Sequence, residues 1–312
     1  MAHINYMNSD ENTSCINDND DNIIGILKAY FELFKPGVMS LAIMSGALGI
    51  IIAPEQISGL KLFWSLLCII LGAGASGAIN MCLEIDIDSQ MSRTSKRPLP
   101  MNKITKERGL EVAYYMAFFS VFFMALFVNV LSASLLFLTI FFYGYIYTLI
   151  LKRRTIYNVV IGGISGAIPP LIGWASVMNS LSWASMSFFW IIFLWIPPHS
   201  WALALYKAKE YQKVSVPMMP VVKGRKFTIY QVVFYSILMI ASTYLPYYFG
   251  LNGGIYLYVT TFSNLVWVYF TMKLMKNIVD KENHRSEKLF FVFSINYLFI
   301  VFFASMIDCF FR

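Results

Sequence analysis

The second long apolar stretch of the chain reads LFWSLLCIILGAGASGAINMCLEIDID over residues 62–88. Residues 62–83 carry no charge, and they are long enough as a helix to cross a hydrocarbon core of about 30 Å. The stretch then ends in Glu84, Asp86 and Asp88. An apolar helix that finishes in acidic residues predicts a membrane span with polar chemistry at the membrane edge.

The composition of the whole chain points the same way. Its 312 residues are 58% hydrophobic and only 13% charged, with a mean hydropathy of +0.62. Soluble domains are roughly 45–50% apolar and about 25% charged. We therefore predict an integral membrane protein and exclude a water-soluble enzyme. The four cysteines show no C-x-x-C spacing, so neither a disulfide framework nor a zinc site is expected.

Apolar runs of spanning length recur along the chain and predict an all-α, polytopic membrane bundle of nine transmembrane helices. The runs are 36–54, 62–83, 110–130, 133–151, 157–177, 183–205, 228–249, 254–275 and 289–310. Residues 1–22, rich in Asn, Asp and Ser, are predicted to form a disordered polar tail. The remainder, 23–312, is predicted to be a single transmembrane domain.

Positive charge gives the orientation of this arrangement. With nine crossings, all but two of the 24 lysines and arginines fall on one side, the exceptions being Lys61 and Arg312. Short cytoplasmic loops retain such residues, so the N-terminus is predicted to be cytoplasmic. The long connections 84–109, 206–227 and 276–288 then lie on the cytoplasmic face. Orientation explains the net charge of +7, and no nucleic-acid partner is expected.

The acidic end of the second span forms a first constellation. Asn80, Glu84 and Asp88 are spaced i, i+4, i+8, which puts them on one face of a helix, whereas Asp86 lies off that face. Like charges at this spacing repel unless a cation neutralises them. Carboxylate and amide oxygens suit Mg²⁺, which also takes oxygens from a substrate phosphate. The alternative is an ordinary acidic helix end exposed to water.

Basic residues follow this acidic face directly. Arg93, Lys96 and Arg97 come within a few residues of Asp88, and a further basic run, Lys152-Arg153-Arg154, opens the fifth span on the same side. Acidic side chains can hold a metal ion, and the metal ion together with the basic side chains can bind an anionic ligand. Diphosphate is the natural candidate for that ligand. The positive-inside bias alone explains the basic residues but not their pairing with the acidic face.

A second constellation lies in the fifth and sixth spans. Small residues mark a buried surface in the fifth span, and Pro169-Pro170 predicts a break or kink there. If the sixth span stays helical from Pro198, then His199, Tyr206 and Glu210 share one face. An intramembrane His can ligate a metal, shuttle a proton or only hydrogen-bond. The loop over residues 216–225, apolar with prolines and basic charge, is a candidate lid.

The motifs in this order resemble those of the UbiA-type intramembrane prenyltransferases, in particular the members that farnesylate heme. The matching motifs are Asn80-x-x-x-Glu84-x-x-x-Asp88 with Met91-x-Arg93-Thr94-x-x-Arg97-Pro98, Lys152-Arg153-Arg154-Thr155, Gly162-Gly163-x-x-Gly166-Ala-x-Pro169-Pro170-x-x-Gly173-Trp174 and Pro198-His199 through Glu210-Tyr211. The similarity runs from about Lys35 to the last span, and it is weak after residue 230.

The resemblance implies transfer of a farnesyl group from farnesyl diphosphate to the vinyl group of heme b, giving heme O and diphosphate, with Mg²⁺ as the ion. It implies catalytic roles for Asn80, Glu84, Asp88, His199 and Glu210, with the first three as metal ligands. Substrate binding is implied for Arg93, Lys96, Arg97, Lys152, Arg153, Arg154 and Tyr206. Related enzymes carry a second aspartate pair, whereas this chain offers only Glu210 at the corresponding place.

Two other functions remain open on the sequence. A UbiA-type enzyme with an aromatic acceptor such as hydroxybenzoate would share the fold, and His199 with the single Glu210 argues against it. A transporter would explain intramembrane polar residues, but it predicts charges near the midplane of several spans. We expect a bacterial inner membrane, because no Arg-rich leader is seen, and heme A synthase or terminal oxidase assembly as receiving partners.

Overall fold

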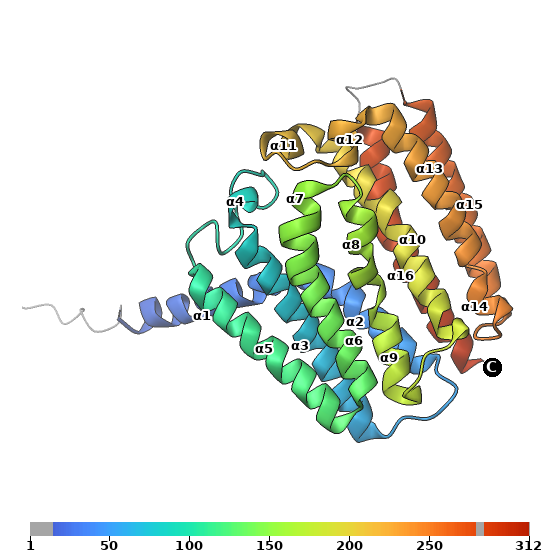
Figure 1. Ribbon diagram of the computed structural model, residues 1–312, viewed down its shortest axis with the longest axis horizontal. Coiled ribbons are helices and arrows are strands. Elements are labelled where there is room, and N and C mark those ends of the chain that lie inside the picture. Colours follow the sequence, from blue (N-terminus) through green and yellow to red (C-terminus); the bar gives the residue numbers. More distant parts are fainter. Residues whose placement is uncertain (1–14, 279–283, 312) are drawn as a thin grey trace, which may run out of the picture.

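The computed structural model describes residues 15–278 and 284–311, and throughout this part of the chain the regular elements are helical. The helices stand side by side in one bundle (Figure 1). The first half comprises α1 (Cys15–Leu33), α2 (Pro36–Ile51), α3 (Gly59–Leu83), α4 (Ile85–Asp88), α5 (Lys106–Phe127), α6 (Val130–Phe141), the π-helix η1 (Phe142–Leu151) and α7 (Lys152–Arg154). The second half comprises α8 (Asn158–Ala167), α9 (Pro169–Met178), α10 (Trp183–Tyr206), α11 (Ala208–Lys213), α12 (Met219–Val222), α13 (Gly224–Ser242), α14 (Leu245–Tyr248), α15 (Gly254–Lys276) and α16 (Arg285–Phe310).

Seven stretches of the described residues are long and apolar enough to cross a membrane, and they confirm a multi-pass, all-α membrane bundle. They are Gly59–Leu83, Lys106–Phe127, Val130–Arg154, Asn158–Met178, Trp183–Tyr206, Gly224–Tyr248 and Arg285–Phe310. The pair Ile23–Leu33 and Pro36–Ile51, bent by 54°, makes an eighth if it is one span. α15 is long enough as well, but its Tyr, Thr and Asn residues lower its hydropathy. The count of nine crossings therefore stays a prediction.

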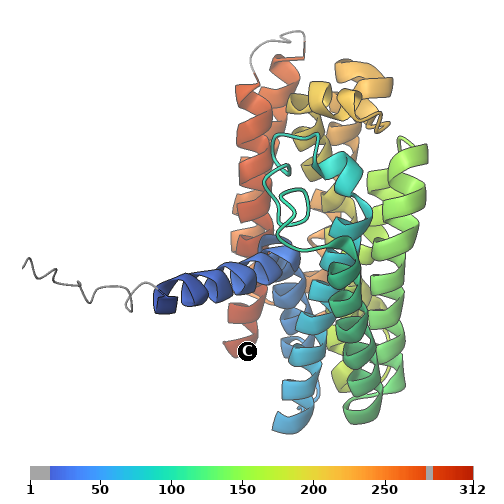
Figure 2. The same cartoon turned by 90° about the vertical axis from the view of Figure 1, so that its left-hand side faces the viewer.

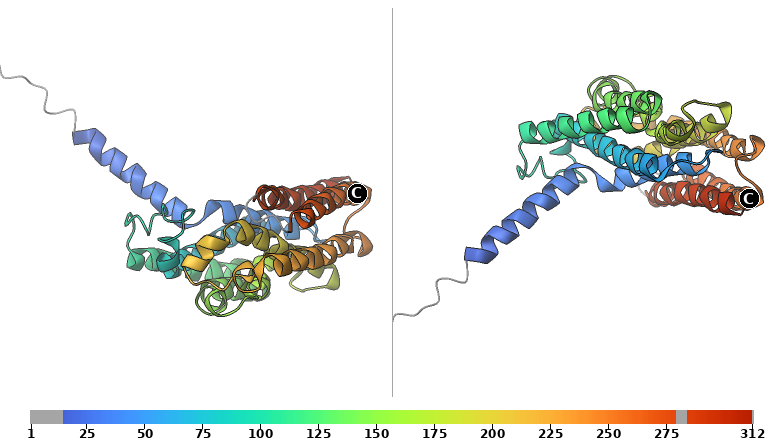
Figure 3. Two further views of the ribbon diagram at one scale, coloured as in Figure 1. Left: turned by 90° about the horizontal axis from the view of Figure 1, so that it is seen from above. Right: turned by 90° about the horizontal axis from the view of Figure 1, so that it is seen from below.

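The predicted tail falls mostly outside the described residues, because these begin at Cys15. Residues 15–22 form the start of α1, so the boundary between tail and membrane domain at residue 22 also stays a prediction. α1 leaves the bundle sideways, as the views from above and below show (Figure 3).

Small residues let α2 and α9 meet backbone to backbone. A Cβ atom placed on Gly49 would lie 2.0 Å from the carbonyl oxygen of Pro170, and one on Gly173 would lie 1.9 Å from the carbonyl oxygen of Gly46. Helices in a membrane associate through close packing rather than through a hydrophobic drive. The predicted packing surface of the fifth span is thus present in α9, and α2 packs against it.

The prolines act differently in the two spans that contain them. Pro169 and Pro170 open α9 after a break at Ile168, as predicted. Pro197 and Pro198 lie inside α10, which continues as a helix to Tyr206. His199 therefore sits on an unbroken helix that leads to one end of the bundle.

That end carries the short helices α4, α7, α11 and α12, while the turns from α5 to α6 and from α9 to α10 lie at the opposite end (Figure 1). A quarter turn about the vertical axis leaves this grouping unchanged (Figure 2). We call the end with α4, α7, α11 and α12 the polar end. The predicted long connections 84–109 and 206–227 meet there, so segments far apart in sequence come together over the ends of the spans.

Candidate functional site

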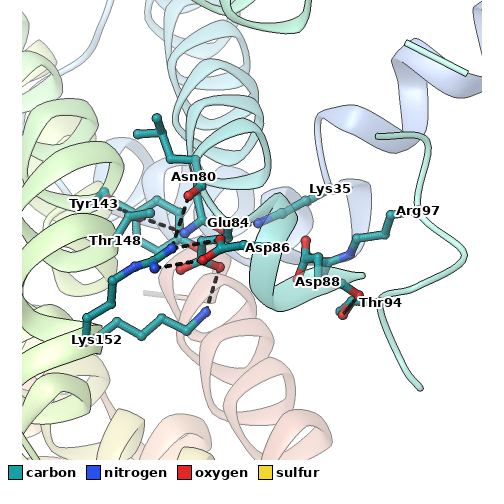
Figure 4. A network of polar contacts seen from close by, with 12 residues as sticks. Lys35, Asn80, Glu84, Asp86, Asp88, Thr94, Arg97, Tyr143, Thr148 and Lys152 are labelled. Atoms are coloured by element: carbon teal, nitrogen blue, oxygen red, sulfur yellow. Dashed lines mark hydrogen bonds and ion pairs between the residues drawn. The ribbon is translucent and has the colours of Figure 1, made fainter. Parts of the chain in front are cut away.

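The acidic constellation lies where α3 ends and α4 begins. α3 ends at Leu83, Glu84 has φ −114° and ψ 18° between the two helices, and the backbone N–H of Asp88 still donates to the carbonyl oxygen of Glu84 at 2.8 Å. The backbone N–H of Ile87 donates to the same oxygen at 3.0 Å, and the two hydrogen bonds keep the chain close to a helical path. Asn80, Glu84 and Asp88 therefore stay together at the polar end (Figure 4).

All three side chains are buried, with 2%, 2% and 3% of the residue surface of Asn80, Glu84 and Asp88 exposed. The alternative of an acidic helix end exposed to water is therefore excluded for Glu84 and Asp88. The segment after α4 folds back over them, and the hydroxyl of Thr94, itself buried, donates to the carbonyl oxygen of Asp88 at 2.9 Å. A buried carboxylate is costly without a partner, so each one needs a nearby cation.

Two of the predicted basic residues supply these cations. The ammonium of Lys152 lies 2.6 Å from Glu84 Oε2, and the guanidinium of Arg97 lies 2.6 Å from Asp88 Oδ2. Their side chains are mostly covered, with 15% and 22% exposed. Lys152 comes from α7 and Arg97 from the loop after α4, so the two basic segments approach the acidic face from different sides.

The remaining predicted cations are placed differently. Arg153 forms two hydrogen bonds of 2.8 Å with the exposed Asp86, and these bonds hold the pKa of that carboxyl below its usual value. Arg154 is exposed. Arg93 and Lys96 are exposed as well, and both line a cavity of about 380 Å³ beside Arg97. Arg93 and Lys96 thus border the acidic site beside Arg97, whereas Arg153 is paired with Asp86.

One side-chain oxygen of the acidic face has no hydrogen-bond partner among the described residues. Glu84 Oε1 is buried and accepts no hydrogen bond from the described residues, although buried carboxylate oxygens are nearly always paired. No cluster of three His, Cys, Asp or Glu side chains with metal-binding geometry occurs among those residues. Mg²⁺ requires no such cluster, because it binds through one or two carboxylates, water and substrate phosphate. Asn80, Glu84 and Asp88 therefore fit this ion.

Two residues at the site were missed by the sequence analysis. Lys35, at the junction of α1 and α2, donates from its ammonium to Asn80 Oδ1, and its backbone is left-handed with φ 55°. Thr148 of η1 accepts a hydrogen bond of 2.7 Å from Asn80 Nδ2. The position of Lys35 directly before Pro36, at the start of a predicted span, could have marked it as a site residue. From the sequence it was used only as one of the positive charges that give the orientation. Nothing in the sequence marked the π-helix that positions Thr148.

His199 lies in a second, more apolar part of the site. Its ring stacks between those of Trp195 and Phe291, with ring centres 4.2 and 4.7 Å away, and its Nδ1 is 2.7 Å from the hydroxyl oxygen of Ser294. The three rings line a cavity of about 430 Å³ that also reaches Tyr143, Tyr147 and Arg93. This cavity, the His199 cavity, thus extends from an aromatic cage to a cation beside the acidic face.

The shared face predicted for His199, Tyr206 and Glu210 is not formed, because α10 ends at Tyr206 and Glu210 belongs to α11. Glu210 instead accepts hydrogen bonds from the backbone N–H of Ser92 at 3.2 Å and its hydroxyl at 2.9 Å, and from the ammonium of Lys207 at 2.5 Å. Lys207 and Ser92 lower the pKa of Glu210, so this link holds at neutral pH and is lost as the pH falls through the lowered pKa. Glu210 thereby ties α11 to the loop that carries the basic residues.

Comparisons with known proteins identify the family of the chain. Residues 42–295 match the model of the UbiA prenyltransferase family. The chain is 46% identical over 276 residues to the protoheme IX farnesyltransferase of Rickettsia bellii, covering 88% of this chain and 91% of the relative, and 47% identical to that of Rickettsia felis, covering 88% and 90%.

Solved structures share the fold at low sequence identity. A structure described for digeranylgeranylglyceryl phosphate synthase in membranes has a TM-score of 0.75 to this chain. The two are 20% identical, and the match covers 91% of this chain and 98% of that one. A UbiA homolog from Archaeoglobus fulgidus bound to DMAPP and Mg²⁺ has a TM-score of 0.67 at 15% identity, covering 88% and 98%.

Proposed function

The chain belongs to the UbiA prenyltransferase family, and on that premise we propose that it is a protoheme IX farnesyltransferase, which joins the farnesyl group of farnesyl diphosphate to a vinyl group of heme b. The observation that carries this proposal is the junction of two environments in one site. Arg93 lines the aromatic His199 cavity, and with Lys35 and Arg97, the partners of Asn80 and Asp88, it also lines the cavity of about 380 Å³. A diphosphate and a large flat apolar acceptor need these two environments side by side.

The first chemical event is loss of diphosphate from the prenyl donor. The bond between farnesyl C1 and the bridging oxygen breaks, and its electron pair leaves with the diphosphate. Arg93, Arg97 and Lys152 are positioned to stabilise the charge that develops on the leaving group, and such preorganised charge is often the largest contribution to rate. Mg²⁺ held by Asn80, Glu84 and Asp88 supplies further Lewis-acid stabilisation of the diphosphate when bound.

The second event forms the new carbon bond. The terminal vinyl carbon of heme b bonds to farnesyl C1, which leaves a cation on the vinyl carbon next to the porphyrin. Oxygen from one water captures that carbon and releases a proton, giving the hydroxyethylfarnesyl group. Tyr143, Tyr147 and Trp195 line the His199 cavity, and their ring faces attract a carbocation while the apolar walls keep other water away.

The proposal extends to the setting of the enzyme. We infer nine crossings, an N-terminus in the cytoplasm and a site on the cytoplasmic side of a bacterial inner membrane, because the basic loops gather at the polar end. Heme O released there would pass to heme A synthase or to terminal oxidase assembly.

The test is an assay of the purified chain with heme b, farnesyl diphosphate and Mg²⁺, followed by mass analysis of the extracted hemes. We expect a product heavier than heme b by one farnesyl group and one hydroxyl group, and no product after chelation of divalent ions. A parallel reaction with hydroxybenzoate serves as the competing acceptor. Prenylated hydroxybenzoate without heme O from active protein would reject the proposed acceptor.

A further inference from the structure

A further cavity, of about 670 Å³, lies at the polar end beside the His199 cavity. Tyr206 lines it and packs edge-on against Phe291 with ring centres 6.2 Å apart, while Phe291 lines the His199 cavity and stacks on His199. The two cavities therefore approach each other at the contact between Tyr206 and Phe291. We call the further one the basic cavity, because Lys207, Lys209, Arg225 and Lys288 line it.

Among the described residues, the positive charges of the basic cavity outnumber the negative ones. Arg225 pairs with the buried Glu287, and Lys207 pairs with Glu210 at 2.5 Å. For Lys209 and Lys288, no described carboxylate lies within ion-pair distance. Among the described residues the cavity thus keeps two positive charges that no acidic side chain neutralises. A ligand with two carboxylates or one dianionic group matches this excess.

The cations also stand next to an aromatic surface. The ammonium groups of Lys207 and Lys288 each lie 5.8 Å from the centre of the Tyr206 ring, which packs on Phe291 of the His199 cavity. A ligand that reaches across this contact presents anionic groups to the lysines and an apolar aromatic body to Phe291 and His199. The arrangement suits a flat amphiphile with acidic groups along one edge.

Building on the proposed function, we infer that the basic cavity binds the two propionate carboxylates of the acceptor porphyrin, with Lys209 and Lys288 as their main partners. The propionates of heme b occupy the edge of the macrocycle opposite the vinyl-bearing edge. Anchoring them here directs the vinyl edge into the His199 cavity toward Tyr147 and Arg93, where the diphosphate departs. The basic cavity would thus select the acceptor and orient it.

The test measures binding without a prenyl donor. Purified protein in nanodiscs of uncharged lipid is titrated with heme b and with heme b dimethyl ester, and binding is followed by the heme absorbance. We expect the wild-type protein to bind heme b about tenfold more tightly than the ester, as two partly exposed ion pairs allow. The double variant Lys209→Gln/Lys288→Gln should bind both equally. The matched control is Lys213→Gln/Lys226→Gln, which removes the same charge from exposed positions outside the cavity and should keep the tenfold preference.

Several results would overturn the inference. One is equal binding of heme b and its ester by the wild-type protein, and another is an unchanged preference in the Lys209/Lys288 variant. Weaker binding of farnesyl diphosphate by that variant would assign the cavity to the diphosphate, and a preference seen only in anionic lipid would assign it to a lipid headgroup. The titration with heme b contains no prenyl donor, so its outcome does not depend on catalysis. A failure to make heme O in the activity assay would count against the proposed function, but it would not change the measured preference for heme b over its ester.

Discussion

The buried carboxylates of Glu84 and Asp88 each form an ion pair with one cation. A substitution that tests the charge alone must therefore keep the volume of the side chain. We expect Glu84→Gln and Asp88→Asn to lower the rate of heme O formation by about 10²–10³, because each weakens the hold on Mg²⁺ and on the paired cation, Lys152 or Arg97, that stabilises the leaving group. Heme b affinity should stay unchanged. Truncation to Ala is less informative, since an unpaired buried cation costs about 3–5 kcal/mol and the protein itself becomes unstable.

The control for both variants is Asp86→Asn. Asp86 lies in α4 with Asp88, but its side chain is 58% exposed and already pairs with Arg153. Its rate should stay within twofold of wild type. A similar loss in Asp86→Asn, or wild-type rates in the other two variants, would contradict a special role for the buried pair.

His199 gives a second prediction for a single residue. Its ring is held by two aromatic neighbours and by Ser294 inside the His199 cavity, so we expect His199→Ala to weaken heme b binding and leave farnesyl diphosphate binding unchanged. Titrations with each substrate alone measure both affinities. The reverse pattern would move His199 to the donor side of the site.

The contact between α2 and α9 leads to a prediction for helix packing. A methyl group at Gly49 would overlap the backbone of α9, and the backbone of a packed helix moves aside less readily than a side chain. We expect Gly49→Ala to lower the melting temperature in detergent strongly or to prevent folding. Gly25→Ala, in α1 with no atom within 4 Å of the added carbon, should leave the melting temperature unchanged or slightly raised. Equal melting temperatures for the two variants would show that the helices separate easily.

Asp308 of α16 supports the start of α15. Its carboxylate accepts the backbone N–H of Gly253 and, at 3.2 Å, that of Tyr256, although the residue is only 2% exposed. Asp308→Ala leaves these donors buried without an acceptor, which costs about 1–3 kcal/mol for each group. We expect a lower melting temperature with unchanged substrate affinities, because the contact lies at the end of α16 remote from Phe291. A loss of heme binding at constant stability would contradict this.

At the scale of the whole molecule, the number of crossings is testable through the C-terminus. Nine crossings from a cytoplasmic N-terminus place the end of α16 outside the cytoplasm, whereas eight crossings return it to the cytoplasm. We therefore expect a reporter active only outside the cytoplasm to work when fused after Arg312, and the same reporter to stay inactive when inserted at Ser89 beside the site. Activity at both positions would reject the proposed orientation.

Much of the architecture could be predicted because its signals are local in sequence. Apolar runs of spanning length, the acidic face at Asn80, Glu84 and Asp88, and the break at Pro169 each depend on neighbours within a few turns of helix. The burial of the acidic face was not predictable in this way. It depends on the segment after α4 folding back over Glu84 and Asp88, which spacing along one helix does not reveal.

The sequence by itself therefore determined a helical membrane protein with an acidic face, nearby cations and an intramembrane His, since hydropathy and helical spacing reside in each segment. Only the tertiary structure decided which cation meets which acid. Lys152 reaches Glu84 while its neighbour Arg153 turns to Asp86, and Glu210 binds Ser92 across 118 residues. These pairings arise from how separate helices end and approach one another at the polar end, and that geometry is a property of the packed bundle as a whole.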